Sequence, residues 1–234
     1  MFYTILRVII GWWARWYLRL EVIGREHVPS SGGLLVACNH VSYLDIPMLA
    51  CALGRRADFM GKLELFRAPV IGWIYRWLGG FPVRRGGVSK EALHEAARRL
   101  RAGRVVVIYP EGQINETGGP LPPKPGVGMI VARSGVPVLP TYVVGTDEAM
   151  PRGQWWIRPR PVKVLIGRPL LFEPHRHDDG THPDAGELTG MRERQRDRYL
   201  EIGQRVMQEI DALRRQSRQG TVAGSQTDCG ANRV

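Results

Sequence analysis

Short apolar runs alternate with stretches of helical period along most of the chain. The apolar runs have the length of buried strands and are mostly bounded by glycine or proline, and they cover 32–38, 57–62, 80–85, 104–112, 136–144 and 161–167. Helices are predicted between them, over 42–53, 68–80, 89–103 and 127–135. Strands that alternate with helices predict an α/β fold, here a single domain whose mostly parallel, mixed sheet is flanked by helices.

The segment over residues 1–20 is rich in tryptophan and contains no acidic residue. On a helix at about 100° per residue, one narrow face collects its small and basic side chains, Thr4, Arg7, Gly11, Ala14, Arg15 and Arg19. The rest of the circumference is apolar and carries Trp12, Trp13 and Trp16. This pattern is typical of an amphipathic helix lying in an anionic membrane surface. The alternative is a helix packed on the domain with its arginines in solvent.

The C-terminal part of the chain is polar. We predict a loop over 173–190, a charged helix over 191–214 and a disordered tail over 215–234. The expected organisation is therefore a membrane-docking helix over 1–20, one domain over 21–214, and the tail. No uncharged apolar run approaches the roughly 18–20 residues that cross a bilayer. We therefore expect a peripheral protein on the cytoplasmic face of the cell membrane.

The net charge of the chain is +11, from 33 Lys and Arg against 22 Asp and Glu. Such an excess favours anionic partners: nucleic acid, anionic lipid or a phosphorylated substrate. The basic residues are scattered and have no stacking aromatics among them, so nucleic-acid binding is not expected. Three His and three Asp crowd residues 175–184, but without the regular spacing that fixes ligand geometry. We therefore predict a solvated loop there and no metal site.

Polar clusters follow three of the predicted strands: Asn39-His40 with Asp45, Arg84-Arg85, and Glu111-Gly112. In an open α/β fold these positions converge on one crevice at the carboxyl ends of the strands. Asp45 has two compatible interpretations. With Ser42 it matches a capping box at the start of a helix. It can also hold one ring nitrogen of a loop-borne His40, which leaves the other nitrogen to take a proton from an alcohol.

The blocks around these clusters resemble those of the glycerolipid (lysophosphatidic acid) acyltransferase family. NHVSYLD, residues 39–45, resembles its NHxxxxD block, and GFPVRR, residues 80–85, resembles its second block. YPEG at 109–112 is similar to its FPEG block, and VPVLP at 136–140 to its fourth. The four blocks occur in the family's order and span about 100 residues, which makes the set far more specific than any one block.

This resemblance implies the family's α/β fold and fatty acyl transfer from a thioester to a hydroxyl, without a metal or bound cofactor. The donor would be acyl-CoA or acyl carrier protein, and the acceptor a lysophospholipid: 1-acylglycerol-3-phosphate would become phosphatidic acid. His40 would be the general base and Asp45 its partner, while Arg85 would bind the acceptor's phosphate. The other implied substrate-binding residues are Arg84, Asn39, Glu111, Gly112 and Lys124, and the Gly112 amide is a candidate oxyanion donor.

One position departs from the family pattern. The family usually follows FPEG with Thr-Arg, whereas this chain has Gln113-Ile114, so one expected phosphate anchor is missing. Arg84, Arg85 and Lys124 are candidates to replace it. Two alternatives therefore stay open: an acyltransferase for another lyso-lipid or a non-phosphate acceptor, and a non-enzymatic lipid-binding protein with a degenerate site.

Overall fold

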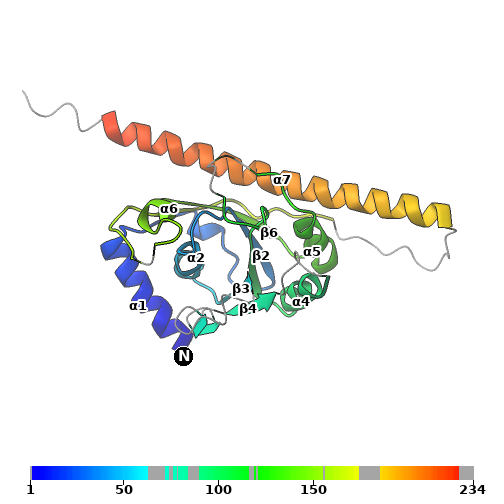
Figure 1. Cartoon of the computed structure of the whole chain (residues 1–234), viewed down its shortest axis with the longest axis horizontal. Helices are drawn as coiled ribbons and strands as arrows, with labels where there is room; N and C mark the ends of the chain where they lie inside the picture. Colours follow the sequence, from blue (N-terminus) through cyan, green and yellow to red (C-terminus); the bar gives the residue numbers. More distant parts are fainter. Residues whose placement is uncertain are drawn as a thin grey trace, which may run out of the picture.

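The computed structural model describes residues 2–62, 72–73, 76–77, 79–83, 90–115, 119, 121–154, 156–173 and 185–226. In it a seven-stranded sheet has the order β1-β7-β6-β2-β5-β3-β4 (Figure 1). All neighbouring strands are parallel except β6 and β7. The strands are β1 Glu21–Ile23, β2 Leu34–Cys38, β3 Ala57–Lys62, β4 Gly80–Val83, β5 Val105–Ile108, β6 Val138–Val144 and β7 Lys163–Ile166. The mostly parallel, mixed sheet predicted from the sequence is thus confirmed.

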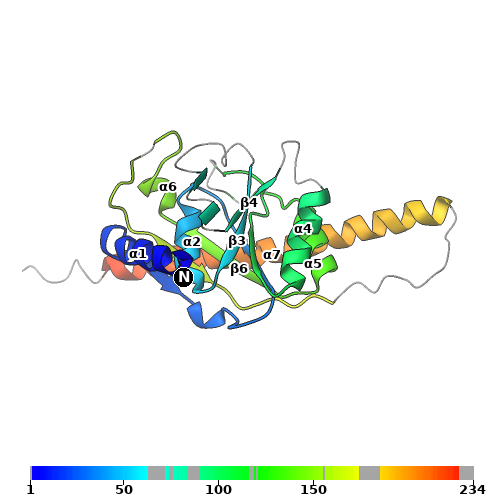
Figure 2. The same ribbon diagram turned by 90° about the horizontal axis from the view of Figure 1, so that it is seen from below.

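Helices cover both faces of the sheet (Figure 2). Successive side chains of β2 point to opposite faces, so Leu34 and Val36 pack with α1 and α2, while Leu35 and Ala37 pack with α4, α5 and α7. Every residue of β2 is buried, as expected for the central strand of a parallel sheet. The main helices are α1 Phe2–Tyr17, α2 Asp45–Leu53, α4 Lys90–Arg101, α5 Gly126–Ser134, α6 Thr146–Ala149 and α7 Ala185–Gln226, with a short 3₁₀ turn, η1, over Arg25–His27.

The predicted helix at the start of the chain exists, and its small residues make a contact with the domain that the sequence did not predict. α1 packs against α2 through its small residues: Gly11 and Ala14 are buried, and Gly11 lies beside Cys51. These residues belong to the face predicted to be polar. The apolar side chains on the other side of α1 are exposed instead, and they are Ile5, Val8, Ile9, Trp12 and Trp16.

The C-terminal helix is much longer than predicted. α7 begins inside the expected loop and continues to Gln226, so residues 215–226 are helical rather than part of a disordered tail. Their polar composition suggested no packing face, but the helix contains no proline, and Asp211 pairs with both Arg214 and Arg215 one turn further on. Its central part is anchored, because Tyr199, Val206 and Ile210 are buried against the domain.

Four predictions fall wholly or partly outside the described residues. The helix predicted over 68–80 is described only at 72–73, 76–77 and 79–80, and the first two pairs are helical. The histidine-rich segment 175–184 and the final residues 227–234 are outside the described ranges, as are Arg84 and Arg85. Within the described residues, no helix combines the length and apolar composition that crossing a membrane requires.

Candidate active site

The site forms where β2, β5 and β6 end, at one edge of the sheet. Because β2 is parallel to both neighbours, the segments that follow these three strands lie side by side. His40 follows β2, Glu111 follows β5, and Thr146 follows β6. The crevice predicted at the carboxyl ends of the strands is therefore built from these three loops.

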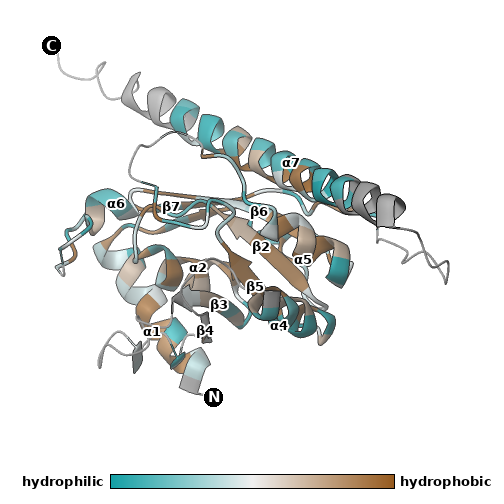
Figure 3. Cartoon of the chain, turned by 45° about the vertical axis from the view of Figure 1, so that its right-hand side comes forward, coloured by the Kyte–Doolittle hydropathy of each residue, from teal (hydrophilic) through white to brown (hydrophobic). Residues whose placement is uncertain are grey.

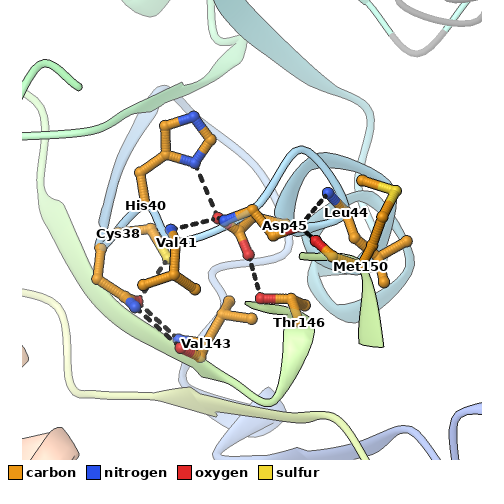
Figure 4. Close-up of polar contacts among 10 residues, drawn as sticks. Cys38, His40, Val41, Leu44, Asp45, Val143, Thr146 and Met150 are labelled. Carbon is orange, nitrogen blue, oxygen red and sulfur yellow. Dashed lines mark hydrogen bonds and ion pairs between the residues drawn. The ribbon is translucent and has the colours of Figure 1, made fainter. Parts of the chain in front are cut away.

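His40 and Asp45 are in direct contact. Nδ1 of His40 donates a hydrogen bond to Oδ2 of Asp45 at 2.8 Å, and the other ring nitrogen points away from the carboxylate (Figure 4). The imidazole lies on the loop before α2, where only a non-helical histidine can turn back onto a residue five positions ahead. This is the arrangement in which a carboxylate fixes the tautomer and leaves Nε2 free to accept a proton.

Asp45 is fully buried, and its carboxylate accepts four hydrogen bonds. Oδ2 accepts the backbone N–H groups of Val41 and Ser42 at 2.9 and 3.0 Å in addition to His40. Oδ1 accepts the hydroxyl of Thr146 at 2.5 Å. The same carboxylate therefore fixes the loop before α2, through the N–H groups of Val41 and Ser42, and orients the imidazole. α2 itself begins at Asp45, and its N-cap residue, Leu44, makes no side-chain cap bond. A buried charge requires this degree of hydrogen bonding.

The His40 ring is held on its face as well as at its edge. The ring of Tyr109 is stacked on it, with centroids 3.9 Å apart and an angle of 14° between the planes. The carbonyl of His40 also accepts the N–H of Asn115 at 2.7 Å. The imidazole side chain is only 12% exposed. The ring is thus fixed by contacts from β5 and its loop as well as by Asp45.

Glu111 brings a second carboxyl group to the site. It is only 4% exposed, and its Oε1 accepts a hydrogen bond from Asn115 Nδ2 at 3.4 Å. Oε2 has no hydrogen-bond partner within the described part of the chain. Burial raises the pKa of Glu111, and the bond from Asn115 opposes the shift. Oε2 is a buried acceptor oxygen, and the substrate-binding role of Glu111 stays a prediction.

Gly112 and Lys124 lie together beside Glu111. Gly112 has a φ of 68°, and a Cβ at this position would lie 2.9 Å from Cδ of Lys124. A larger residue would therefore displace the lysine from the site. The Gly112 amide donates to the carbonyl of Tyr109 at 2.9 Å, so it is not free to stabilise an oxyanion. That candidate role for Gly112 is wrong, whereas its role in shaping the acceptor site stays a prediction.

Asn39 has a structural role in place of the expected substrate contact. Its Nδ2 donates to the carbonyl of Val143 at 2.9 Å, and its Oδ1 accepts the N–H of the same residue at 2.8 Å. The side chain is buried and ties the loop after β2 to the end of β6. Neighbouring Cys38 is buried too, and burial raises the pKa of its thiol well above the ordinary value, which disfavours a thiolate nucleophile.

A cavity of about 220 Å³ adjoins this loop and extends toward α7. Asn39, Glu111 and Asn115 line it on the side of the site, and Arg214 and Arg218 line it on the side of α7. No cluster of metal-binding side chains occurs among the described residues. The described side chains on the side of the site offer proton transfer and hydrogen bonding, and the side of α7 carries Asp211 as well as the two arginines.

The structure brings most of the predicted site residues together and adds three more. His40, Asp45, Glu111, Gly112 and Lys124 are neighbours, while Arg84 and Arg85 are outside the described residues, directly after β4. Sequence reasoning missed the roles of Tyr109, Asn115 and Thr146. The position of Tyr109 inside the YPEG block was a signal, but nothing in the sequence linked Thr146 to a residue 101 positions earlier.

The sequence and the structure of the chain are similar to those of known acyltransferases. A family model described as Acyltransferase matches residues 19–144, which is more than half of the chain. A solved structure, that of the 1-acyl-sn-glycerophosphate (LPA) acyltransferase PlsC from Thermotoga maritima, is similar with a TM-score of 0.62 and 29% identity. The similarity covers 90% of this chain and 81% of that one, so the fold is shared over nearly the whole chain.

Several curated relatives are similar in sequence. The 1-acyl-sn-glycerol-3-phosphate acyltransferase BAT2 of Brassica napus, described as chloroplastic, is 34% identical over 158 residues, which are 66% of this chain and 46% of that protein. The 1-acyl-sn-glycerol-3-phosphate acyltransferase of Bacillus subtilis is 26% identical over 190 residues, which are 81% of this chain and 90% of that protein. The chain thus spans less than half the length of the Brassica relative and most of the length of the bacterial one.

Proposed function

The chain belongs to the acyltransferase family, and from this membership and the geometry of its site we propose that it acylates a lysophospholipid. The acyl donor is a thioester of coenzyme A or of acyl carrier protein. The acceptor is 1-acylglycerol-3-phosphate, and the product is phosphatidic acid. The observation that carries this proposal is the buried Asp45 carboxylate bonded to Nδ1 of His40, which leaves Nε2 available as a base.

The reaction uses the acceptor's own hydroxyl as the nucleophile. Nε2 of His40 removes the hydroxyl proton while the oxygen attacks the thioester carbonyl, which forms a tetrahedral intermediate. The intermediate collapses to the new ester, and the departing thiolate takes the proton back from the imidazolium. Asp45 stabilises the imidazolium through the bond to Nδ1, and no acyl-enzyme is formed. A thioester is already activated, so a positioned base supplies much of what this transfer needs.

The acceptor lies on the side of Glu111 and Lys124 in this proposal. The unpaired Oε2 of Glu111 accepts a hydrogen bond from the glycerol part of the acceptor. We assign the phosphate to Lys124, which is exposed beside Gly112, and to Arg85. Together they take the place of the arginine that the family usually carries at the position of Ile114. Charge-assisted contacts to phosphate of this kind are about twice as strong as neutral hydrogen bonds.

A membrane surface delivers this acceptor, and we assign its docking to α1. Ile5, Val8, Ile9, Trp12 and Trp16 are 49%, 59%, 59%, 70% and 72% exposed and recur at helical spacing along one side of the helix. Figure 3 shows hydrophobic (brown) segments along the ribbon of α1, which lies at the outside of the domain. Single exposed apolar residues are normal on a protein surface, but a continuous stripe with two tryptophans is not. Because the opposite side of α1 is fixed on α2, the stripe is held outward, and Arg15 and Arg19 are exposed near it to meet anionic headgroups.

A different acceptor is the second candidate, and Ile114 is the observation that favours it. A chain with fewer phosphate anchors suits an acceptor whose headgroup is larger or uncharged. A non-enzymatic lipid-binding role is not favoured, because the described site retains the complete His40–Asp45 pair and the stacked Tyr109.

A panel of substrates tests the proposal. The full chain is purified and supplied with acyl-CoA or acyl carrier protein donors and with three acceptors: 1-acylglycerol-3-phosphate, its phosphocholine analogue and monoacylglycerol. Mass spectrometry of the products should show the fastest transfer to 1-acylglycerol-3-phosphate. Faster transfer to monoacylglycerol would refute the phosphate contact, and the absence of transfer from either donor to any acceptor would refute the activity.

A further inference from the structure

Four contacts join the loop that carries His40 and Asp45 to the segment from Val143 to Met150. Two are the reciprocal bonds between the Asn39 amide and the backbone of Val143. A third runs from the Ser42 hydroxyl to the carbonyl of Met150 at 2.9 Å. The fourth runs from the Thr146 hydroxyl to Oδ1 of Asp45 at 2.5 Å (Figure 4). The segment after β6 thus helps to hold the His40–Asp45 pair in place.

The backbone around Thr146 directs its hydroxyl at the carboxylate. Gly145 has a φ of 89°, and a Cβ at this position would collide with the carbonyl oxygen of Pro161. Only glycine fits this turn, which ends β6 and begins α6 at Thr146. Thr146 is completely buried. A buried threonine hydroxyl needs an acceptor, and here that acceptor is the carboxylate that orients the imidazole.

The hydroxyl is also the one donor that the described structure gives to Oδ1. The other three donors, His40 and the backbone N–H groups of Val41 and Ser42, all bond to Oδ2. Without the hydroxyl, Oδ1 is a buried, charged oxygen with no donor, and the carboxylate gains by turning or by drawing in water. Either movement displaces Oδ2. Because Oδ2 accepts three hydrogen bonds whose donors have fixed positions, its displacement weakens the bond from His40.

We propose that Thr146 is a positioning residue for acyl transfer, which acts through Asp45. This inference rests on the proposed function, since it assigns the hydroxyl a part in holding the general base. Thr146 does not touch the substrate. Its loss therefore lowers kcat and leaves the KM of both substrates unchanged.

Three variants separate this role from a structural one. Thr146→Val keeps the shape and removes the hydroxyl, whereas Thr146→Ser keeps the hydroxyl and removes a methyl group. Thr141→Val is the matched control, because Thr141 is also completely buried on β6 but its hydroxyl donates to the carbonyl of Leu139, at 3.4 Å. The measurements are kcat, both KM values and the thermal midpoint, on whichever acceptor of the panel the wild type acylates.

Thr146→Val should lower kcat by about tenfold or more, the effect of losing one hydrogen bond to a charged group. Thr146→Ser should keep at least half of the wild-type kcat, and Thr141→Val should keep all of it. If Thr146→Val does not fold, Thr146→Ala beside Thr146→Ser isolates the hydroxyl in the same way. Full kcat in the variants without the hydroxyl would overturn the positioning role alone. A wild type that acylates no acceptor would overturn the proposed function as well.

Discussion

The substitution Asp45→Asn separates the charge of the carboxylate from its hydrogen bonds. Asparagine has nearly the same shape, and its amide oxygen can take the place of Oδ2. There it still accepts the N–H groups of Val41 and Ser42. The amide NH₂ then faces Thr146, whose hydroxyl can rotate and accept from it. The fold around the start of α2 should therefore survive the change, because asparagine also caps helices well.

The effects on stability and on activity should be of very different size. Hydrogen bonds to a charged acceptor become neutral ones, but the cost of burying the charge disappears, so the net loss of unfolding free energy is about 1–2 kcal/mol. In a chain of this length that lowers the melting temperature by about 2–8 °C. The amide cannot stabilise an imidazolium, so kcat should fall by about 10² to 10⁴.

Initial rates of acyl transfer and calorimetric melts of the same preparations are the assay. Asp58→Asn is the matched control, because Asp58 is equally buried but lies at the other end of the strands, paired with Arg99 at 3.0 Å and Arg104 at 2.6 Å. That variant should lose more stability and keep its kcat. If Asp45→Asn kept full activity, Asp45 would be a helix cap alone and the mechanism proposed for His40 would be wrong.

Two further predictions concern the phosphate and the membrane. Arg85→Ala should raise the KM of the acceptor about ten- to hundredfold and leave that of the donor unchanged; an unchanged acceptor KM would assign the phosphate to Arg84 or indicate an uncharged acceptor. Replacing Trp12 and Trp16 by serine should reduce sedimentation with anionic vesicles, whereas Leu171→Ser, which removes an exposed apolar side chain outside α1, should not. Equal sedimentation of all three proteins would refute docking through α1, and salt should weaken binding without abolishing it.

The sequence was informative about the sheet because the pattern of a buried strand is local. Each strand from β2 to β7 lies within an apolar run identified in the sequence, and the family resemblance is confirmed by the match over residues 19–144. β1 was missed because its three residues, Glu21–Ile23, are too few to show a period. The contact between α1 and α2 was not predicted, because small residues such as Gly11 permit close approach whatever the hydropathy of their neighbours.

In the site too, contacts between residues close in the sequence could be predicted, whereas contacts between distant segments could not. His40 and Asp45 are five residues apart, so their pairing could be read from one block. The contacts of Thr146 and Tyr109 depend on β2 lying between β5 and β6, and no local pattern contains that order. Asn39 was assigned to the substrate because it lies beside His40, whereas its amide bonds to a strand 104 residues later in the chain.

The most direct test of the central claim is the rate of acyl transfer by His40→Ala beside the wild type. His94→Ala is the control, since His94 is an exposed histidine on α4 that contacts Arg133. The account predicts that the wild type and His94→Ala acylate 1-acylglycerol-3-phosphate at similar rates. His40→Ala should be slower by about 10² to 10⁴, while it still folds and binds vesicles like the wild type. A His40→Ala protein that transfers acyl groups at the wild-type rate would contradict the account.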